Sequence, residues 1–136
     1  MSKQSKQKAR TLAPQELESL RKSLLAEKQQ MIEMYHNDVQ AARDIKEEGF
    51  EDFEELASMD FDREMLYSMS ESELDKLLQI DEALERMNKG TYGRCMYSGE
   101  PIPLERLREV PWTRYAAVIQ TLVEKGLIDE NRYAVN

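Results

Sequence analysis

Two long stretches of helical periodicity constrain this chain more than any other feature of its sequence. The first opens with Pro14, Gln15 and Glu16, which suit a first helical turn because proline loses no hydrogen bond there and acids face the positive dipole end. Apolar residues then recur at spacings of three, four and seven up to Ile45, and no Pro or Gly follows before Gly49. This pattern predicts one helix of about 35 residues, roughly 50 Å long.

The second stretch places its apolar residues near heptad positions. They are Leu66, Met69, Leu77, Ile80, Leu84 and Met87. The run Asn88-Lys89-Gly90 is a good C-terminal stop for a helix. Two amphipathic helices of similar length around a short connection bury their apolar stripes against each other, which predicts an antiparallel coiled-coil hairpin over residues 14–89.

The part of the chain after the hairpin differs in kind. It is too rich in Gly and Pro for a long helix at first, with five such residues within 19 positions: Gly93, Gly99, Pro101, Pro103 and Pro111. An apolar-periodic stretch from Trp112 to about Lys125 then predicts a short helix. The fold class expected is therefore all-α: a flexible basic tail over 1–13, the long hairpin over 14–89, and a small globular module with a C-terminal helix over 90–136.

Charge and composition exclude several classes of protein. The net charge of −8 argues against binding along duplex DNA, whose phosphates repel an acidic partner. The single cysteine, Cys95, excludes an intramolecular disulfide framework and fits a reducing compartment. No apolar run approaches the roughly 20 residues that span a bilayer, and the Lys-rich N-terminus lacks the apolar core of a signal peptide. We therefore expect a cytoplasmic protein that neither enters a membrane nor reads DNA sequence.

The hairpin must reverse in an acidic segment, which we call the acidic tip (residues 47–57). Six carboxylates fall within nine residues: Glu47, Glu48, Glu51, Asp52, Glu54 and Glu55. One interpretation is a solvated turn; the other is a probe, held by a stiff coiled coil, that meets a cation or basic groups in a partner's cavity. Acid–base catalysis would need a partly desolvated pocket to tune the carboxyl pKa values. A lone hairpin tip has no such pocket, so we expect no enzymatic activity.

The segment from Thr91 to Glu100 has the layout of a zinc knuckle, with a Gly turn before a first ligand position. A structural zinc site needs four ligands in a tetrahedron, and here only Cys95 qualifies, because Ser98 is a poor ligand. His36, the only histidine, lies within the first predicted helix and is interpreted as an ordinary helix residue. We expect no bound zinc, and a Cys95 that packs as a small apolar side chain.

At this point the residues resemble the DksA/TraR family, whose members regulate bacterial RNA polymerase by inserting a coiled coil through its secondary channel. The likeness covers roughly residues 14–120. It is strongest in 90–95 (GTYGRC), 99–103 (GEPIP) and 111–115 (PWTRY). The resemblance implies RNA polymerase as the partner, a role in transcription regulation of the stringent-response type, and a monomer.

The resemblance also assigns the zinc positions. The family's C-x2-C-x17-C-x2-C pattern falls on Cys95, Ser98, Ala116 and Ile119, so three of four ligands are replaced. Ala116 and Ile119 lie three residues apart on the last predicted helix, where apolar packing can fill the space of a metal. The module is thereby expected to keep its shape as a degenerate, zinc-free finger.

In the same gapless register the family's tip motif, D-x-x-D-x-A, falls on Asp52, Glu55 and Ala57. By resemblance, the two acids act near the polymerase's bridge helix, trigger loop and catalytic magnesium, and Ala57 supports close packing. The family's binding site for the alarmone ppGpp uses basic residues, whereas Gln79, Val110 and Gln120 stand at three positions where we expect them. Because a pyrophosphate loses its strongest contacts without Lys or Arg, we expect no ordinary ppGpp response.

Two other classes of function remain open. A structural or adaptor coiled coil would bind a partner other than polymerase through its helix faces and would tolerate loss of the tip acids. A metal-dependent redox or zinc-sensing protein would require bound metal, including an intermolecular site that shares Cys95 between chains.

Overall fold

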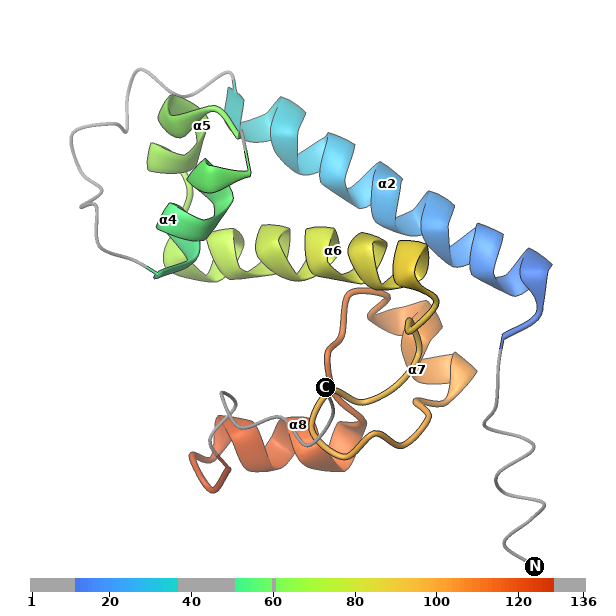
Figure 1. Cartoon of the computed structure of the whole chain (residues 1–136). Helices are drawn as coiled ribbons and strands as arrows, with labels where there is room; N and C mark the ends of the chain where they lie inside the picture. The colour runs from blue at the N-terminus through green and yellow to red at the C-terminus, as the bar shows by residue number, and fades with distance from the viewer. Residues whose placement is uncertain (1–11, 37–50, 60, 129–136) are drawn as a thin grey trace, which may run out of the picture.

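The computed structural model of the chain describes residues 12–36, 51–59 and 61–128. Helices are its regular elements (Figure 1): α2 (Pro14–His36), α4 (Glu51–Ser58), α5 (Arg63–Tyr67), α6 (Glu71–Lys89), α7 (Leu104–Glu109) and α8 (Ala117–Glu124). Within these ranges there is no strand, and the β-type pairing present is an isolated bridge between Arg94 and Pro101. The predicted all-α fold class is confirmed. Of the helices in the described ranges, none is long and apolar enough to cross a membrane.

Helices α2 and α6 form the antiparallel pair that the sequence predicts, lying side by side in opposite directions (Figure 1). The apolar stripe of α2 is buried at Leu20, Leu24 and Met31. Ion pairs flank the interface: Lys76 Nζ lies 2.6 Å from Glu27 Oε2, and Lys28 Nζ lies 2.9 Å from Asp81 Oδ1. Residues 37–48 of the first predicted helix lie outside the described residues.

The end of α6 agrees with the sequence and its start does not. The helix ends at Lys89, and Gly90 adopts a left-handed φ of 80° as the C-cap, a conformation that glycine takes without a Cβ clash. The sequence pattern placed Leu66 and Met69 in this helix, but it begins only at Glu71. The reason is local: the Glu73 amide donates to Ser70 Oγ (3.2 Å), and the Ser70 amide donates to Glu73 Oε1 (2.7 Å). This capping box satisfies two backbone donors that a continuous helix would have used otherwise.

The described part of the predicted acidic tip is helix α4, which packs against α5 and α6. Its apolar face belongs to the core, since Phe53 and Leu56 have 0% of their surface exposed. The Phe53 ring also lies 4.9 Å from the Tyr67 ring, centroid to centroid. Residues 47–50 lie outside the described residues.

The module after α6 is a set of tight turns followed by α7 and α8. The Cys95 amide donates to the Glu100 carbonyl (2.8 Å), the Ile102 amide to Gly93 (2.8 Å), and the Met96 amide to Arg114 (2.8 Å). Its small core contains Cys95, Ile102, Leu107 and Tyr115. The last helix, predicted from Trp112, begins instead at Ala117, because residues 113–115 form a hydrogen-bonded turn described below.

The capping box gives a first prediction. Replacing Ser70 by Ala removes the side-chain acceptor for the Glu73 amide and should lower the free energy of unfolding by about 1 kcal/mol. The matched control is Ser19→Ala on the exposed face of α2, where alanine is a better helix former and stability should be unchanged or slightly higher. Urea unfolding followed by circular dichroism measures both. Equal stabilities of Ser70→Ala and wild type would contradict the start assigned to α6.

Candidate functional site

The acidic residues of α4 lie on the side of the helix that its apolar residues leave free. Phe53 and Leu56 face the core, Glu54 and Glu55 are exposed, and Asp52 is half-buried. The helix ends where the Ser58 hydroxyl donates to the Glu55 carbonyl (2.7 Å). Burial of the apolar face therefore fixes which carboxylates of α4 face solvent.

All three predicted tip residues fall on this one helix. Asp52 and Glu55 lie three residues apart, which places them on neighbouring positions of one helix face. Ala57 is half-buried and packs against the core, as expected of a small residue at a close contact. The structure thus brings the three positions together, and their role at a partner stays a prediction.

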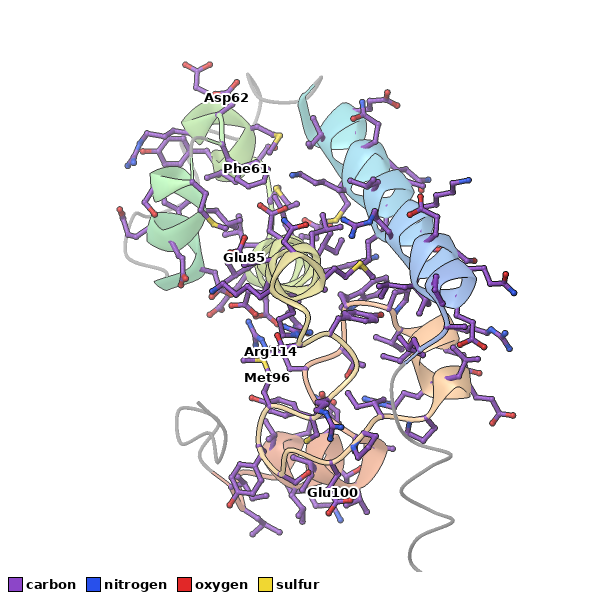
Figure 2. The ribbon with its side chains drawn as sticks, turned by 45° about the vertical axis from the view of Figure 1, so that its right-hand side comes forward. Phe61, Asp62, Glu85, Met96, Glu100 and Arg114 are labelled. Atoms are coloured by element: carbon purple, nitrogen blue, oxygen red, sulfur yellow. The ribbon has the colours of Figure 1, made fainter. Side chains whose placement is uncertain are left out.

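Glu55 lines an open groove of about 490 Å³, here called the α4–α6 groove. Its walls come from α2, α4, α6 and the module, and they include Lys28, Glu55, Met59, Asp81, Glu85 and Met96. Lys28 is engaged by Asp81, and Glu82 of the same wall accepts from Arg114 Nε (2.8 Å). Figure 2, which looks nearly along α6, shows α4 and α2 on different sides of that helix.

Of the four predicted zinc positions, Ser98 and Ala116 lie next to Cys95 in the module. Cys95 is 1% exposed, and its sulfur accepts hydrogen bonds from the Ser98 hydroxyl and from the backbone amides of Ser98, Ala116 and Tyr97. Ser98 is exposed, whereas Ala116 and Ile119 are half-buried and pack against the core. In the described part of the chain no group of three or more His, Cys, Asp or Glu side chains could hold a metal ion.

These contacts change the acidity of the thiol. Burial raises the pKa of Cys95, but the hydrogen bonds from Ser98, Ala116 and Tyr97 outweigh it, so the net pKa lies below that of an ordinary cysteine. Hydrogen bonds to the charged form stabilise a thiolate in this way. Two of the partners of Cys95, Ser98 and Ala116, stand at positions that the family pattern gives to zinc ligands.

A polar cluster that the sequence did not reveal holds the turn between α7 and α8. Arg106 Nε donates to the Tyr115 carbonyl (2.9 Å), and its Nη2 donates to Thr113 Oγ1 (3.1 Å). Thr113 Oγ1 also donates to the Tyr115 carbonyl (2.9 Å) and accepts from the Tyr115 amide (3.2 Å). Thr113 is 2% exposed, and such a buried hydroxyl is tolerated only when satisfied. No local sequence signal identifies these partners, because they depend on the tertiary turn.

A second unforeseen residue, Arg114, joins the module to α6 (Figure 2). It is 8% exposed. Its Nε lies 2.8 Å from Glu82 Oε1, and its Nη1 lies 3.8 Å from Asp75 Oδ1. Arg86 Nη2 reinforces the joint by donating to the Thr113 carbonyl (3.2 Å). Two guanidinium groups therefore anchor the module to the hairpin, one from Arg114 of the module and one from Arg86 of α6.

The three positions that lack the expected basic residues are also placed. Gln79 is half-buried and donates through Nε2 to Asp75 Oδ2 (2.7 Å), and Gln120 donates to Glu124 Oε2 (3.0 Å). Val110 is the C-cap of α7. The hydrogen-bond partner of each glutamine is a carboxylate, which does not favour a phosphate ligand.

With this geometry known, the chain can be compared with other proteins. No family model matches it. An uncharacterized protein of Aquifex aeolicus is 40% identical over 111 residues, which cover 80% of this chain and 77% of that protein. The RNA polymerase-binding transcription factor DksA of Caulobacter vibrioides is 31% identical over 96 residues, 71% of this chain and 67% of that protein.

A solved structure is similar in fold. The RNA polymerase binding protein and transcriptional regulator Dks of Chlamydia trachomatis superposes with a TM-score of 0.55 at 25% sequence identity, over 88% of this chain and 99% of that chain. The likenesses and the fold together define an all-α protein of the DksA type. The chain belongs to the DksA/TraR family.

The joint at Arg114 gives a second prediction. Arg114→Gln leaves Glu82 without its charged partner inside the joint and should lower the free energy of unfolding by roughly 2 kcal/mol, less than a fully buried pair because both acids stay partly exposed. Arg108→Gln, at an exposed position of α7, is the matched control and should change little. Thermal unfolding of the two variants measures the difference. Equal melting temperatures for Arg114→Gln and Arg108→Gln would contradict the role of Arg114 in joining the module to α6.

The Cys95 thiol gives a third prediction, on pH. The folded thiol releases its proton at a lower pH than the unfolded thiol, whose pKa is about 8.5. Unfolding therefore takes up a proton between these two pKa values, so the contribution of Cys95 to stability rises with pH across that window and is complete above about 8.5. It is lost as pH falls through the folded pKa.

Cys95→Ser keeps a hydrogen-bonding side chain that does not ionise. The urea midpoint of the wild type should exceed that of Cys95→Ser by more at pH 9 than at pH 6. A difference that is the same at both pH values would show that no thiolate forms at this position.

Proposed function

We propose that this chain is a non-enzymatic regulator of transcription that binds bacterial RNA polymerase in the cytoplasm. The observation that carries the proposal is family membership over both the hairpin and the module. Relatives from Caulobacter vibrioides and Chlamydia trachomatis are named as RNA polymerase-binding regulators, and the likeness to the latter spans 88% of this chain. The described architecture is compatible with such a role in each of its parts.

The hairpin is the part suited to enter a narrow channel. Helix α2 has 23 residues, which is about 35 Å at 1.5 Å per residue, and its pairing with α6 makes the hairpin elongated, with α4 packed on α6 from another side. Ion pairs between Lys76 and Glu27 and between Lys28 and Asp81 brace it. In the proposed mechanism the hairpin enters the secondary channel of polymerase, and Asp52 and Glu55 act on the elements around the catalytic magnesium during initiation.

Carboxylates suit that task for an electrostatic reason. A cation or an arginine-rich loop attracts them strongly where water is excluded. On α4 itself Glu55 is exposed, so its carboxyl lacks the desolvated surroundings that tune a general acid or base. The proposed output is therefore a change in the partner's reaction and not a reaction of this chain.

The module is proposed to dock at the rim of the channel and to hold its shape without zinc. The supporting contacts are the four hydrogen bonds to the Cys95 sulfur and the Arg106, Thr113 and Tyr115 cluster. We further propose that the chain acts as a monomer and does not depend on ppGpp, since Gln79, Val110 and Gln120 offer no positive charge.

The tip acids provide the test of this function. We expect Asp52→Asn/Glu55→Gln to bind core polymerase with similar affinity but to lose most of the effect on transcription in vitro, at least tenfold, because the charges act after docking. Glu54→Gln is the matched control, an exposed acid of the same helix outside the motif, and should behave as the wild type. A wild type that neither binds polymerase nor alters transcription would contradict the proposed function. A fully active double variant would contradict the tip assignment and favour an adaptor that binds through its helix faces.

Zinc independence is tested separately. Protein purified from zinc-supplemented cells should contain far less than one zinc per chain, and treatment with a chelator should leave its melting temperature unchanged. Elemental analysis that finds one zinc per chain would contradict the proposal, and half a zinc per chain would indicate an intermolecular site that shares Cys95.

A further inference from the structure

Helix α4 packs on α6 and crosses it at an angle (Figure 1). It contacts α5 and α6 (Figure 1), and its contact is apolar, with Phe53 and Leu56 0% exposed. Phe53 is held further by the Tyr67 ring and by the guanidinium of Arg63, which lies 5.2 Å from the Phe53 ring centroid. The acid-bearing helix is thus a packed element of the core.

This packing turns Glu55 toward the base of the hairpin. Glu55 and Met59 share the α4–α6 groove with Glu85 of α6 and with Met96 of the module. Glu85 lies 14 residues from the first residue of α6, Glu71, which is about 21 Å along the helix axis. A carboxylate in this groove therefore lies well behind the end of α6 that a channel would meet first.

The α4–α6 groove is lined by more acidic than basic side chains. Glu55 shares the groove with three other acids, Asp81, Glu82 and Glu85. Lys28 and Arg114 offset two of them, at Asp81 and Glu82, but neither ion pair includes Glu55. Lys28 and Arg86 line the same groove, so its walls carry charges of both signs, and the buried apolar contact of Phe53 and Leu56 is what holds α4 in place.

The backbone between α4 and α6 permits a different arrangement. No Gly or Pro occurs from residue 50 to residue 89, so the breaks after Ser58 and Tyr67 are not imposed by helix-breaking residues. They are held by side-chain caps: Asp62 Oδ1 accepts from the Glu64 amide (3.0 Å), and Ser70 forms the capping box of α6. Two packings of one sequence that differ by a few caps and contacts can serve as the two states of a conformational switch.

We propose that α4 against α6 is a stowed position of the acid-bearing helix, and that α4 must leave α6 before Asp52 and Glu55 act on a partner. The functional role of this release rests on the proposed function. The stowed state itself is a property of the free chain. A basic or cation-bearing cavity favours release, because it offers Asp52 and Glu55 more positive charge than the mixed walls of the groove do. Binding then shifts the population toward the released state.

A reversible link between α4 and α6 tests the proposal. Met59→Cys/Glu85→Cys, made in the Cys95→Ser background, places two thiols on the walls of the α4–α6 groove. A bis-methanethiosulfonate linker long enough to span the groove joins them only in the stowed state. In a continuous helix the two positions would lie 26 residues, about 39 Å, apart, beyond the reach of the linker.

We expect the linked protein to have at least tenfold less effect on transcription than the same protein after the linker is cleaved with dithiothreitol. The matched control is Glu27→Cys/Lys76→Cys, which joins α2 to α6 across the hairpin at an ion pair of 2.6 Å. Its linked and cleaved forms should be equally active, because both states keep the hairpin. A linked Met59/Glu85 protein as active as its cleaved form would overturn the proposal while leaving the proposed function intact.

Spin labels on the same two cysteines separate the two ideas further. Pulsed dipolar spectroscopy should find a short distance in the free protein and a distribution that shifts to several times that distance when polymerase is added. A long distance in the free protein would overturn the stowed state. A short distance that persists in polymerase-bound protein would overturn the release, and absence of binding would contradict the proposed function alone.

Discussion

Burial of the apolar side chains of α6 is the interaction on which the rest of the described structure depends. Leu74, Leu77, Ile80 and Ala83 have 0% of their surface exposed, and fully burying a leucine or isoleucine contributes about 1.5–3 kcal/mol. Helix α2 and helix α4 cover this helix from different sides (Figure 2), and the module is tied to it through Arg114 and Arg86. One helix of 19 residues thereby positions the hairpin, the acidic residues and the finger-like module together.

Hydrogen bonds around Cys95 and around Thr113 hold the turns of the module. A zinc ion fixes four side chains at one point. Here the sulfur of Cys95 is surrounded by hydrogen-bond donors, and Arg106 fixes the following turn through Thr113 and Tyr115. Each such bond contributes only about 1 kcal/mol, so several are needed. These contacts are the ones on which the proposed zinc-free module depends.

Much of this architecture could be predicted from the sequence. The all-α class, the pairing of α2 with α6 and the helix end at Lys89 follow from apolar spacing and from Gly90, which are local signals. The break before Glu71 was missed because Ser70 and Glu73 form a capping box inside a region whose apolar period continues. The position of α4 was not predictable either, because it depends on burying Phe53 and Leu56 against a helix distant in sequence.

The candidate site likewise has a part that the sequence predicts and a part that only the fold reveals. The positions of Asp52, Glu55 and Ala57 on one helix agree with the motif spacing, whereas the carboxylates that Glu55 meets could be known only from the fold. The polar partners of Thr113 and Arg114 were missed for the same reason, since a buried polar group is satisfied by whatever the tertiary structure brings to it.

The most direct measurement of the central claim is the place that α4 reaches on polymerase. A photo-crosslinking amino acid at Glu54, an exposed neighbour of the two motif acids, leaves Asp52 and Glu55 in place. On irradiation with core polymerase it should form crosslinks, identified by mass spectrometry, to the elements that line the secondary channel near the catalytic magnesium. Crosslinks confined to the outer surface of polymerase, or none at all with a protein that is folded, would contradict the account.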